Sequence, residues 1–467
     1  MNIKTIGQAG LVFLLTAVCA ILLLFGTACI PQTAIEEQVK SSAGYFQEKS
    51  LFPYLNHNQF NCRQDNYADS ILVNIMYHVG QGQDENLFSS VMYAAYYNEE
   101  MQAVNESLAI AVESPQTANV PYFRYWHGSL ALLRPLFLVT DIVGARLVLG
   151  IAALLSMILT SLLLWKRKQR ALAVCFFVCY LLVNGLMGLF CIEYVMMLLL
   201  AGIVCFYLVL TYREEVAAEV RRKQVFLTMV ITGALACFFD FLTTETLTLT
   251  LPLFLEFALE QNASSMNTQR ISTTKQTSVF RDELQQLFVC GLGWGFAYAG
   301  MFLVKWGISA CLFGRKAFMA ALSSASERIG GTVHLGDTNL DPEASVWQRL
   351  TGALSRNISA LFPFRDEMNL AAGVLWFCLA LLLCFSVIYL LHTKELSFDK
   401  IGIFLLLGVL PYLRYLALSN HSYMHYFFTY RAQMVTVLAA FYLTWEYGLK
   451  NLKKQNPGKQ NLRKPRK

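Results

Sequence analysis

Two stretches of the chain place residues that could do chemistry beside strongly apolar segments. The first, NCRQDNYADSILVNIMYH (61–78), carries Asp65 and Asp69 just before apolar positions at helical spacing. The two carboxylates share a helix face if the helix begins before them; otherwise Asp65 or Asn66 caps its N-terminus. A carboxylate held at such a position could remove a proton from a substrate as a general base.

The second stretch, LSNHSYMHYFFTYR (418–431), brings His421, His425 and Arg431 together between two apolar runs. Two histidines four residues apart lie on one helix face, where they could bind a metal, form structural hydrogen bonds or contact a substrate. The stretch offers no carboxylate to complete a metal site, so the pattern requires no cofactor and leaves a divalent cation open. A guanidinium such as that of Arg431 needs an anion to offset its desolvation, and a lipid-linked phosphate would supply one.

A third stretch, VPYFRYWHGSLALLRP (120–135), mixes aromatic rings with hydrogen-bond donors. Its polar and aromatic residues are Arg124, Tyr125, Trp126, His127 and Arg134. Such a mixture suits a site that stacks a sugar or binds a lipid headgroup. It equally suits the aromatic belt that membrane proteins carry at the interface.

The composition indicates what kind of protein carries these residues. Of 467 residues, 56% are hydrophobic and 15% are charged, whereas soluble domains average about 45–50% and 25%. We therefore expect an all-α polytopic membrane protein. Outside the C-terminal tail no basic patch with interleaved aromatic residues occurs, so we expect no nucleic-acid partner.

Ten apolar runs approach the roughly 20 residues that a helix needs to cross the hydrocarbon core. They lie at 9–30, 146–165, 171–188, 191–211, 224–241, 243–259, 285–312, 368–391, 400–418 and 426–447. The third and the sixth of these runs are short, and they fit a slanted or partial crossing.

Lysine and arginine in the short connections predict the orientation of the helices. The segments WKRKQR (165–170), YREEVAAEVRRK (212–223) and HTKELSFDK (392–400) and the C-terminal tail are basic. The alternate short connections, near 189–191, 242 and 419–425, carry no Lys or Arg. All the basic segments fall on one side of a ten-helix count. We therefore expect a multi-pass protein of the cell membrane with both termini in the cytoplasm.

This count divides the chain into membrane and aqueous parts. The expected order is a first transmembrane helix (1–30), an extracytoplasmic loop domain (31–135), helices two to six (136–259), a cytoplasmic loop (260–284), helix seven (285–312), a second extracytoplasmic loop (313–367), helices eight to ten (368–447) and a basic cytoplasmic tail (448–467). Apolar residues at helical spacing over 346–361 predict an amphipathic helix that lies on the outer membrane face.

Polar side chains within the apolar runs are costly unless they pair or function. Those at or near the outer ends are Glu193, Asp240, Glu245, Lys305 and Arg414. We expect none at the cytoplasmic end, and this asymmetry predicts one outward-facing polar cavity. In the alternative, the two basic side chains reach the outer headgroups and the acids cap helix ends.

This organisation resembles the GT-C superfamily, membrane glycosyltransferases that take sugar from a polyprenyl-phosphate carrier. The resemblance rests on the acid-bearing first outer loop, the basic residues near the outer mouth of the bundle and the amphipathic helix of the second outer loop. Asp65 and Asp69 are the best match to the acids of the family's first loop. The tight acid-x-acid pair of many members and the tryptophan-rich motif of oligosaccharyltransferases are absent.

The resemblance implies transfer of a sugar to an extracytoplasmic acceptor, with Asp65 as the base and Asp69 as the second choice. Arg431, Arg414 and Lys305 would stabilise the phosphate that leaves. The two histidines of the second stretch would bind that phosphate or position the acceptor, and the polar residues of the third stretch and of the outer helix ends would contact the substrate. The partners would be a polyprenyl-phosphate-linked sugar and membrane lipids.

Two other classes of protein fit the same residues. A transporter or lipid flippase also needs charged groups inside a bundle, although the large outer loops and the expected lack of charge in the inner half argue against it. The other class is a non-catalytic subunit of a cell-envelope assembly complex.

Overall fold

The computed structural model describes residues 3–55, 60–81, 86–114, 116–267, 279–330, 345–361 and 398–449. Within these ranges the chain is mostly helical and contains no β-strand, only two isolated bridges. Six described helices are long and apolar enough to cross a membrane: α1 (Ile3–Ala28), α7 (Ile142–Lys166), α9 (Ile192–Thr211), α10 (Ala218–Phe239), α12 (Val279–Phe313) and α16 (Phe398–Ala417). The expected all-α membrane protein with several spans is confirmed.

The other four predicted spans are not among these six. The third forms the shorter helix α8 (Arg170–Leu182). The sixth belongs to α11 (Leu247–Asn267), which carries the buried Glu256 and continues beyond its predicted end. The tenth is broken into short helical segments that include α19 (Met434–Leu443). The eighth, at 368–391, lies outside the described residues. The same holds for 331–344 and 362–367 of the second loop and for 450–467 of the tail.

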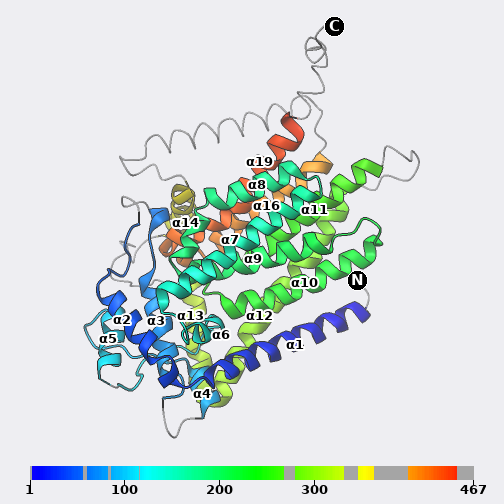
Figure 1. Cartoon of the computed structure of the whole chain (residues 1–467). Helices are drawn as coiled ribbons and strands as arrows, with labels where there is room; N and C mark the ends of the chain where they lie inside the picture. Colours follow the sequence, from blue (N-terminus) through cyan, green and yellow to red (C-terminus); the bar gives the residue numbers. More distant parts are fainter. Residues whose placement is uncertain are drawn as a thin grey trace.

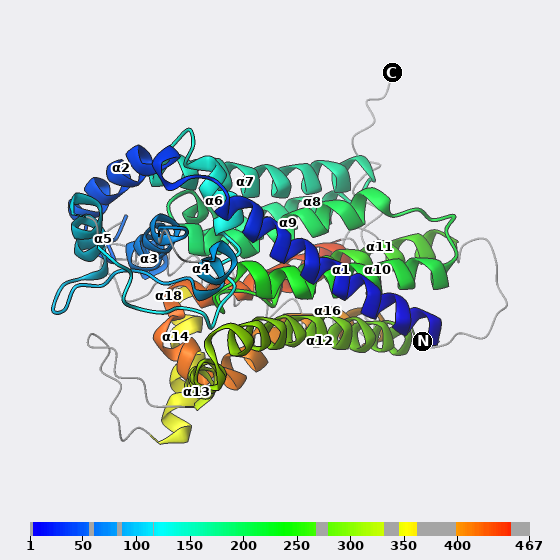
Figure 2. The ribbon, with the colours of Figure 1, turned by 90° about the horizontal axis from the view of Figure 1, so that it is seen from below.

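The long helices form one bundle, and the short helices gather at one end of it (Figure 1). The view turned by 90° shows the same arrangement, with the N-terminus at the other end (Figure 2). We call the end with the short helices the capped end. Its helices are α2 (Glu36–Gln47), α3 (Asn66–His78), α4 (Leu87–Tyr93), α5 (Val104–Glu113), α6 (Leu130–Leu136), α13 (Arg315–Gly330), α14 (Val346–Leu361), α17 (Ser419–Met424) and α18 (Tyr426–Thr429).

Glycines allow the long helices of the bundle to approach closely. A Cβ atom added at Gly202 of α9 would lie 2.0 Å from the Ser156 hydroxyl of α7. One added at Gly233 of α10 would lie 2.2 Å from the carbonyl oxygen of Trp294 in α12. Small residues at helix contacts are typical of membrane bundles, where van der Waals packing replaces the hydrophobic effect.

The predicted amphipathic helix of the second loop is present as α14. Its exposed apolar residues include Val346 and Trp347, which are 62% and 72% exposed, whereas Ala353 and Asn357 face inward. Asn357 attaches the helix to the chain around 422–433, since its side chain donates to the Ser422 carbonyl at 2.9 Å and accepts from the Thr429 hydroxyl at 2.7 Å. α14 thus holds in place the stretch 418–431, which carries His421 and His425.

The connections expected in the cytoplasm meet at the end of the bundle opposite the capped end. Arg167 after α7 donates to the Tyr212 carbonyl after α9 at 2.8 Å, and Asn262 of α11 donates to Gln169 at 2.8 Å. This grouping supports the pattern of basic connections along the chain, although which compartment the end faces stays a prediction.

The expectation that buried charge is confined to the outer half of the bundle is wrong. Arg221 of α10 and Glu256 of α11 form a buried ion pair at 2.5 Å at the opposite end. Sequence inspection assigned Arg221 to a solvated loop, but α10 begins at Ala218 and turns this side chain inward. A charge buried there is tolerated because it has a partner.

Candidate functional site

A pocket of about 300 Å³ lies at the capped end, where the N-terminus of α3 meets five other segments. The polar and aromatic residues that line it are Asp65, Tyr67, Tyr122, Arg124, Tyr125, His127, Glu193, Phe241, Glu327, Arg328, His421, His425 and Phe428. We call it the capped-end pocket. It joins all three stretches that the sequence singled out, from residues more than 300 positions apart.

Asp65 lies in the pocket because it caps α3. Its side chain accepts a hydrogen bond from the backbone N–H of Ala68 at 2.9 Å, so the N-cap interpretation is correct for this residue. The cap does not exclude a second role, since the same carboxyl lines the pocket and is only 4% exposed.

The carboxyl groups of Asp65 and Glu193 share a hydrogen bond across the pocket. Two ionised carboxylates only accept, so one of the pair must carry a proton. Burial raises the pKa of Asp65 to about 6, partly opposed by the N–H of Ala68 and by the hydrogen bond with Glu193. Because the Ala68 N–H stabilises an ionised Asp65, whereas Glu193 Oε2 has no partner among the described residues, the proton belongs on Glu193.

Two guanidinium groups bring positive charge to the pocket. Arg124 lies against the ring of Tyr122, with its central carbon 4.1 Å from the ring centroid. Arg328, near the end of α13, places Nη1 3.5 Å from Nδ1 of His421. Each keeps donors that can face a ligand, which suits an anionic group such as a phosphate.

His421 and His425 lie side by side, with ring centroids 4.5 Å apart. Nε2 of His421 donates to the Leu242 carbonyl at 2.7 Å, which leaves Nδ1 as the acceptor toward Arg328. Burial lowers the pKa of His425 to about 3, and burial together with His425 lowers the pKa of His421 as well. The pair is therefore neutral near pH 7 and offers polar contacts rather than charge.

His127 contributes an acceptor from the chain between α5 and α6. Its backbone is left-handed (φ +55°), a region that histidine enters more often than most residues. Nε2 donates to the Tyr122 carbonyl at 3.0 Å, while the buried Nδ1 has no partner among the described residues. Burial lowers the pKa of His127 to about 3, so the ring stays neutral and Nδ1 can accept from a ligand hydroxyl.

Asp69, the second acid of the sequence analysis, does not line the pocket. It pairs with Arg146 of α7 at 2.7 Å and accepts from the backbone N–H of Ile192 at 3.0 Å. Arg146 also donates to Asn66 at 2.9 Å. Asp69 thus joins α3 to two long helices, and its surroundings are those of a structural ion pair.

The cations expected to bind the leaving phosphate also lie outside the pocket lining. Arg431 donates to the carbonyls of Phe427 and Asn61, both at 3.2 Å, and its guanidinium packs on Tyr194. Lys305 is fully buried and donates to the Met92 carbonyl at 2.8 Å.

The remaining predicted site residues have partners of their own elsewhere at the capped end. Arg414 pairs with Glu245 at 2.8 Å. Asp240 accepts from the backbone N–H of Thr243 at 3.0 Å. Arg134 donates to three backbone carbonyls, of Met76, Val79 and Ile30. Their role in substrate binding stays a prediction.

Sequence reasoning missed Arg328 and Tyr67 as site residues. Arg328 belongs to a polar helix in the second loop, and no pattern in SASERIG separates it from a solvated arginine. Tyr67 lies two residues after Asp65 and could have been found from its place in the first turn of α3. Among the described residues, no three His, Cys, Asp or Glu side chains come together in a way that could hold a metal ion.

Comparison with known proteins adds no further identification. No protein-family model, curated protein or solved structure matches the chain.

Proposed function

We propose that the chain is a membrane glycosyltransferase that moves a sugar from a polyprenyl-phosphate carrier to an acceptor at the capped end. The observation that carries the proposal is the Asp65–Glu193 carboxyl pair in a pocket that also holds Arg124 and Arg328. A base and a cationic anion site in one pocket are the two parts that this reaction needs.

The reaction can be written with these groups. The acceptor oxygen forms a bond to the anomeric carbon, while the bond from that carbon to the phosphate oxygen breaks. Asp65 takes the acceptor's proton, and the polyprenyl phosphate leaves with the electron pair. Arg328 and Arg124 stabilise the negative charge that grows on the phosphate.

Glu193 and the neutral side chains complete the site. In the Asp65–Glu193 pair Glu193 carries the shared proton, so Asp65 is the one ionised carboxylate. The hydrogen bond that Glu193 donates keeps the Asp65 carboxylate in place. Nδ1 of His127 accepts from a sugar hydroxyl, and the rings of Tyr122, Tyr125 and Phe241 provide the apolar walls on which a sugar packs. A volume of about 300 Å³ fits a small ligand group, at the lower end of the usual range for ligand sites.

The test uses full-length protein in nanodiscs with a panel of polyprenyl-phosphate sugars and simple hydroxyl acceptors. Wild type is expected to transfer one of the sugars. The Asp65→Asn variant should bind that donor without transferring it, because asparagine keeps the cap but cannot take a proton. If no donor binds to wild type, or if the variant transfers sugar at the wild-type rate, the proposal is wrong.

A transporter or lipid flippase is the second candidate. The buried Arg221–Glu256 pair removes one argument against it, because charge now lies at both ends of the bundle. The same nanodisc preparation separates the two functions: a flippase would move a fluorescent polyprenyl phosphate between leaflets in vesicles without consuming the sugar.

A further inference from the structure

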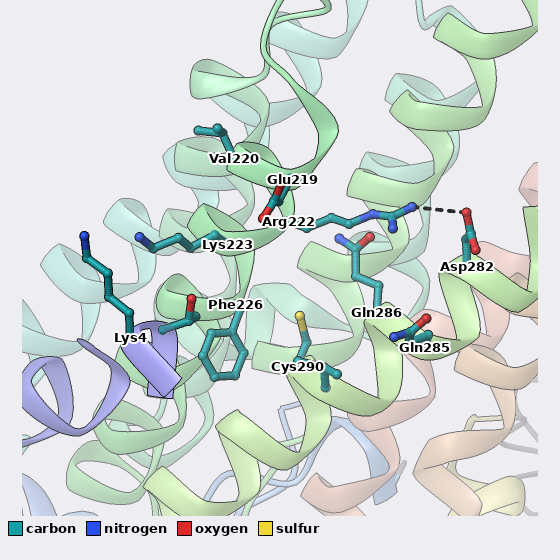
Figure 3. A pocket seen from close by; sticks show the side chains of 12 residues that line it. Lys4, Glu219, Val220, Arg222, Lys223, Phe226, Asp282, Gln285, Gln286 and Cys290 are labelled. Carbon is teal, nitrogen blue, oxygen red and sulfur yellow. Dashed lines mark ion pairs between the residues drawn. The ribbon is translucent and has the colours of Figure 1, made fainter. Parts of the chain in front are cut away.

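A second cavity, of about 510 Å³, lies at the end of the bundle opposite the capped end. It is formed where the first turns of α1, α10 and α12 meet (Figure 3). Its polar lining includes Lys4, Glu219, Arg222, Lys223, Asp282 and Gln286. None of these residues takes part in the capped-end pocket.

Gln286 of α12 is the most informative residue of this cavity. Its side chain is only 5% exposed, yet neither Nε2 nor Oε1 has a hydrogen-bond partner among the described residues. Figure 3 shows its amide pointing into the cavity between Arg222 and Cys290. A buried amide without a partner is costly, because it has given up its hydrogen bonds to water, so a polar ligand atom at this place would stabilise it.

The charge of the cavity favours an anion. Arg222 pairs with Asp282 at 3.5 Å, but both side chains are more than 40% exposed, so the pair is weak. Lys4 and Lys223 form no ion pair within the described residues, and Figure 3 shows both extending to the same side of the cavity. Three cations face two acids, so the lining carries one net positive charge, and beyond the Arg222–Asp282 pair the two lysines face only the carboxylate of Glu219.

The surroundings favour a lipid as the source of that anion. All three helices around the cavity are among those that can cross a membrane, and its apolar wall includes Phe226 and Val289. On α12 the exposed residues Leu284, Phe288 and Leu292 continue as a stripe away from this end, with Phe288 65% exposed. A headgroup held in the cavity would have an apolar surface beside it for its acyl chains.

We propose that this cavity binds the phosphate group of an anionic phospholipid. The ammonium groups of Lys4 and Lys223 contact the phosphate oxygens, and the amide of Gln286 donates to the headgroup. A bound lipid of this kind joins α1 to α10 and α12. Basic pockets between membrane helices are a known way to recognise lipid headgroups.

The experiment compares full-length protein in detergent by native mass spectrometry with added phosphatidylglycerol or phosphatidylcholine. Wild type is expected to retain phosphatidylglycerol in preference to phosphatidylcholine. The double variant Lys4→Gln/Lys223→Gln should bind phosphatidylglycerol about tenfold more weakly. The matched control, Lys166→Gln/Lys168→Gln, removes two exposed lysines from the same end without touching the cavity and should bind as wild type does.

Two further arms make the test specific. Gln286→Leu should weaken phosphatidylglycerol binding while leaving the melting temperature of the lipid-free protein unchanged or higher, because the unpaired amide is gone. Inorganic phosphate should not raise the melting temperature in phosphatidylcholine nanodiscs. Equal loss in the control variant, no loss in the cavity variants, or stabilisation by inorganic phosphate alone would each overturn the proposal.

Discussion

Asp65 and Asp69 lie four residues apart at the start of α3, and only Asp65 lines the capped-end pocket. Asp65 shares its hydrogen bond with Glu193, whereas Asp69 forms an ion pair with Arg146 at 2.7 Å. Asp65 is the N-cap and has a non-helical backbone, so its carboxyl faces the pocket, whereas the carboxyl of Asp69, in the first turn of α3, faces α7. This difference in surroundings assigns the two acids different expected roles, which mutation can separate.

The substitution Asp65→Asn should lower the rate of sugar transfer by about 100- to 10,000-fold, the usual contribution of a general base. Donor affinity and melting temperature should change little, since asparagine is as good an N-cap as aspartate. Single-turnover transfer and donor binding measured on the same nanodisc sample check this. A matched loss of binding and transfer would point to misfolding of the pocket instead of a missing base.

The substitution Asp69→Asn should destabilise the fold by about 3–5 kcal/mol, because it leaves the buried guanidinium of Arg146 without its charge partner. Its measurement is thermal or denaturant unfolding in detergent. The double variant Asp69→Asn/Arg146→Met should recover part of the loss, as the unpaired charge is then removed. If Asp69→Asn unfolds like wild type but no longer transfers sugar, Asp69 is the functional acid and Asp65 is only a cap.

Sugar transfer should rise with pH through about 6. Asp65 acts as a base only when ionised, and burial raises its pKa to that value, so activity is lost as the pH falls below it. The groups that act on this pKa are Glu193, Asp69 and Arg63. A pH–rate profile under single-turnover conditions measures the midpoint.

Glu193→Gln provides the partner experiment. Glutamine donates a hydrogen bond to Asp65 as the protonated glutamic acid does, but it can never become negative. Because Glu193 already carries its proton while Asp65 titrates, the midpoint of the pH profile should stay near that of wild type, and transfer near pH 7 should continue. A midpoint that falls well below that of wild type would show that Glu193 is ionised in the wild-type pair.

Arg328→Met should weaken binding of the donor by about tenfold to 100-fold, since a charge-assisted hydrogen bond to a phosphate is worth about 1.5–3 kcal/mol. The matched control is Lys316→Gln, which removes an exposed charge from the same helix far from its pocket end. Donor binding by fluorescence or calorimetry distinguishes them. An equal effect of both variants would mean that α13 contributes only general positive charge.

The capped end should face the outside of the cell. In a background with the exposed Cys19, Cys29 and Cys311 replaced by serine, Met101→Cys should react with a membrane-impermeant maleimide in intact cells, because Met101 is 96% exposed at the capped end. Glu215→Cys, between α9 and α10, should react only after permeabilisation. The reverse pattern would invert the topology and place the capped-end pocket in the cytoplasm.

The sequence by itself determined the class of the protein and the neighbourhood of its site. Apolar runs of membrane-spanning length recur along the chain, and lipid tolerates such runs only as helices with their backbone groups paired. For the same reason the polar residues near the outer helix ends stood out. The three stretches singled out by their residue types, 61–78, 120–135 and 418–431, do converge on one pocket. The helix at 346–361 followed from spacing alone.

Only the tertiary structure decided which of these residues share the pocket. Arg431 and Asp69 are of the right type and in the right neighbourhood, but each is turned toward a partner that lies far away in the sequence: Asn61 for Arg431 and Arg146 for Asp69. Arg328 carries no local signal, yet α13 brings it beside His421. Spacing along a chain reveals the face of one helix, whereas the choice between an ion pair and an open site depends on what the neighbouring helices place opposite it.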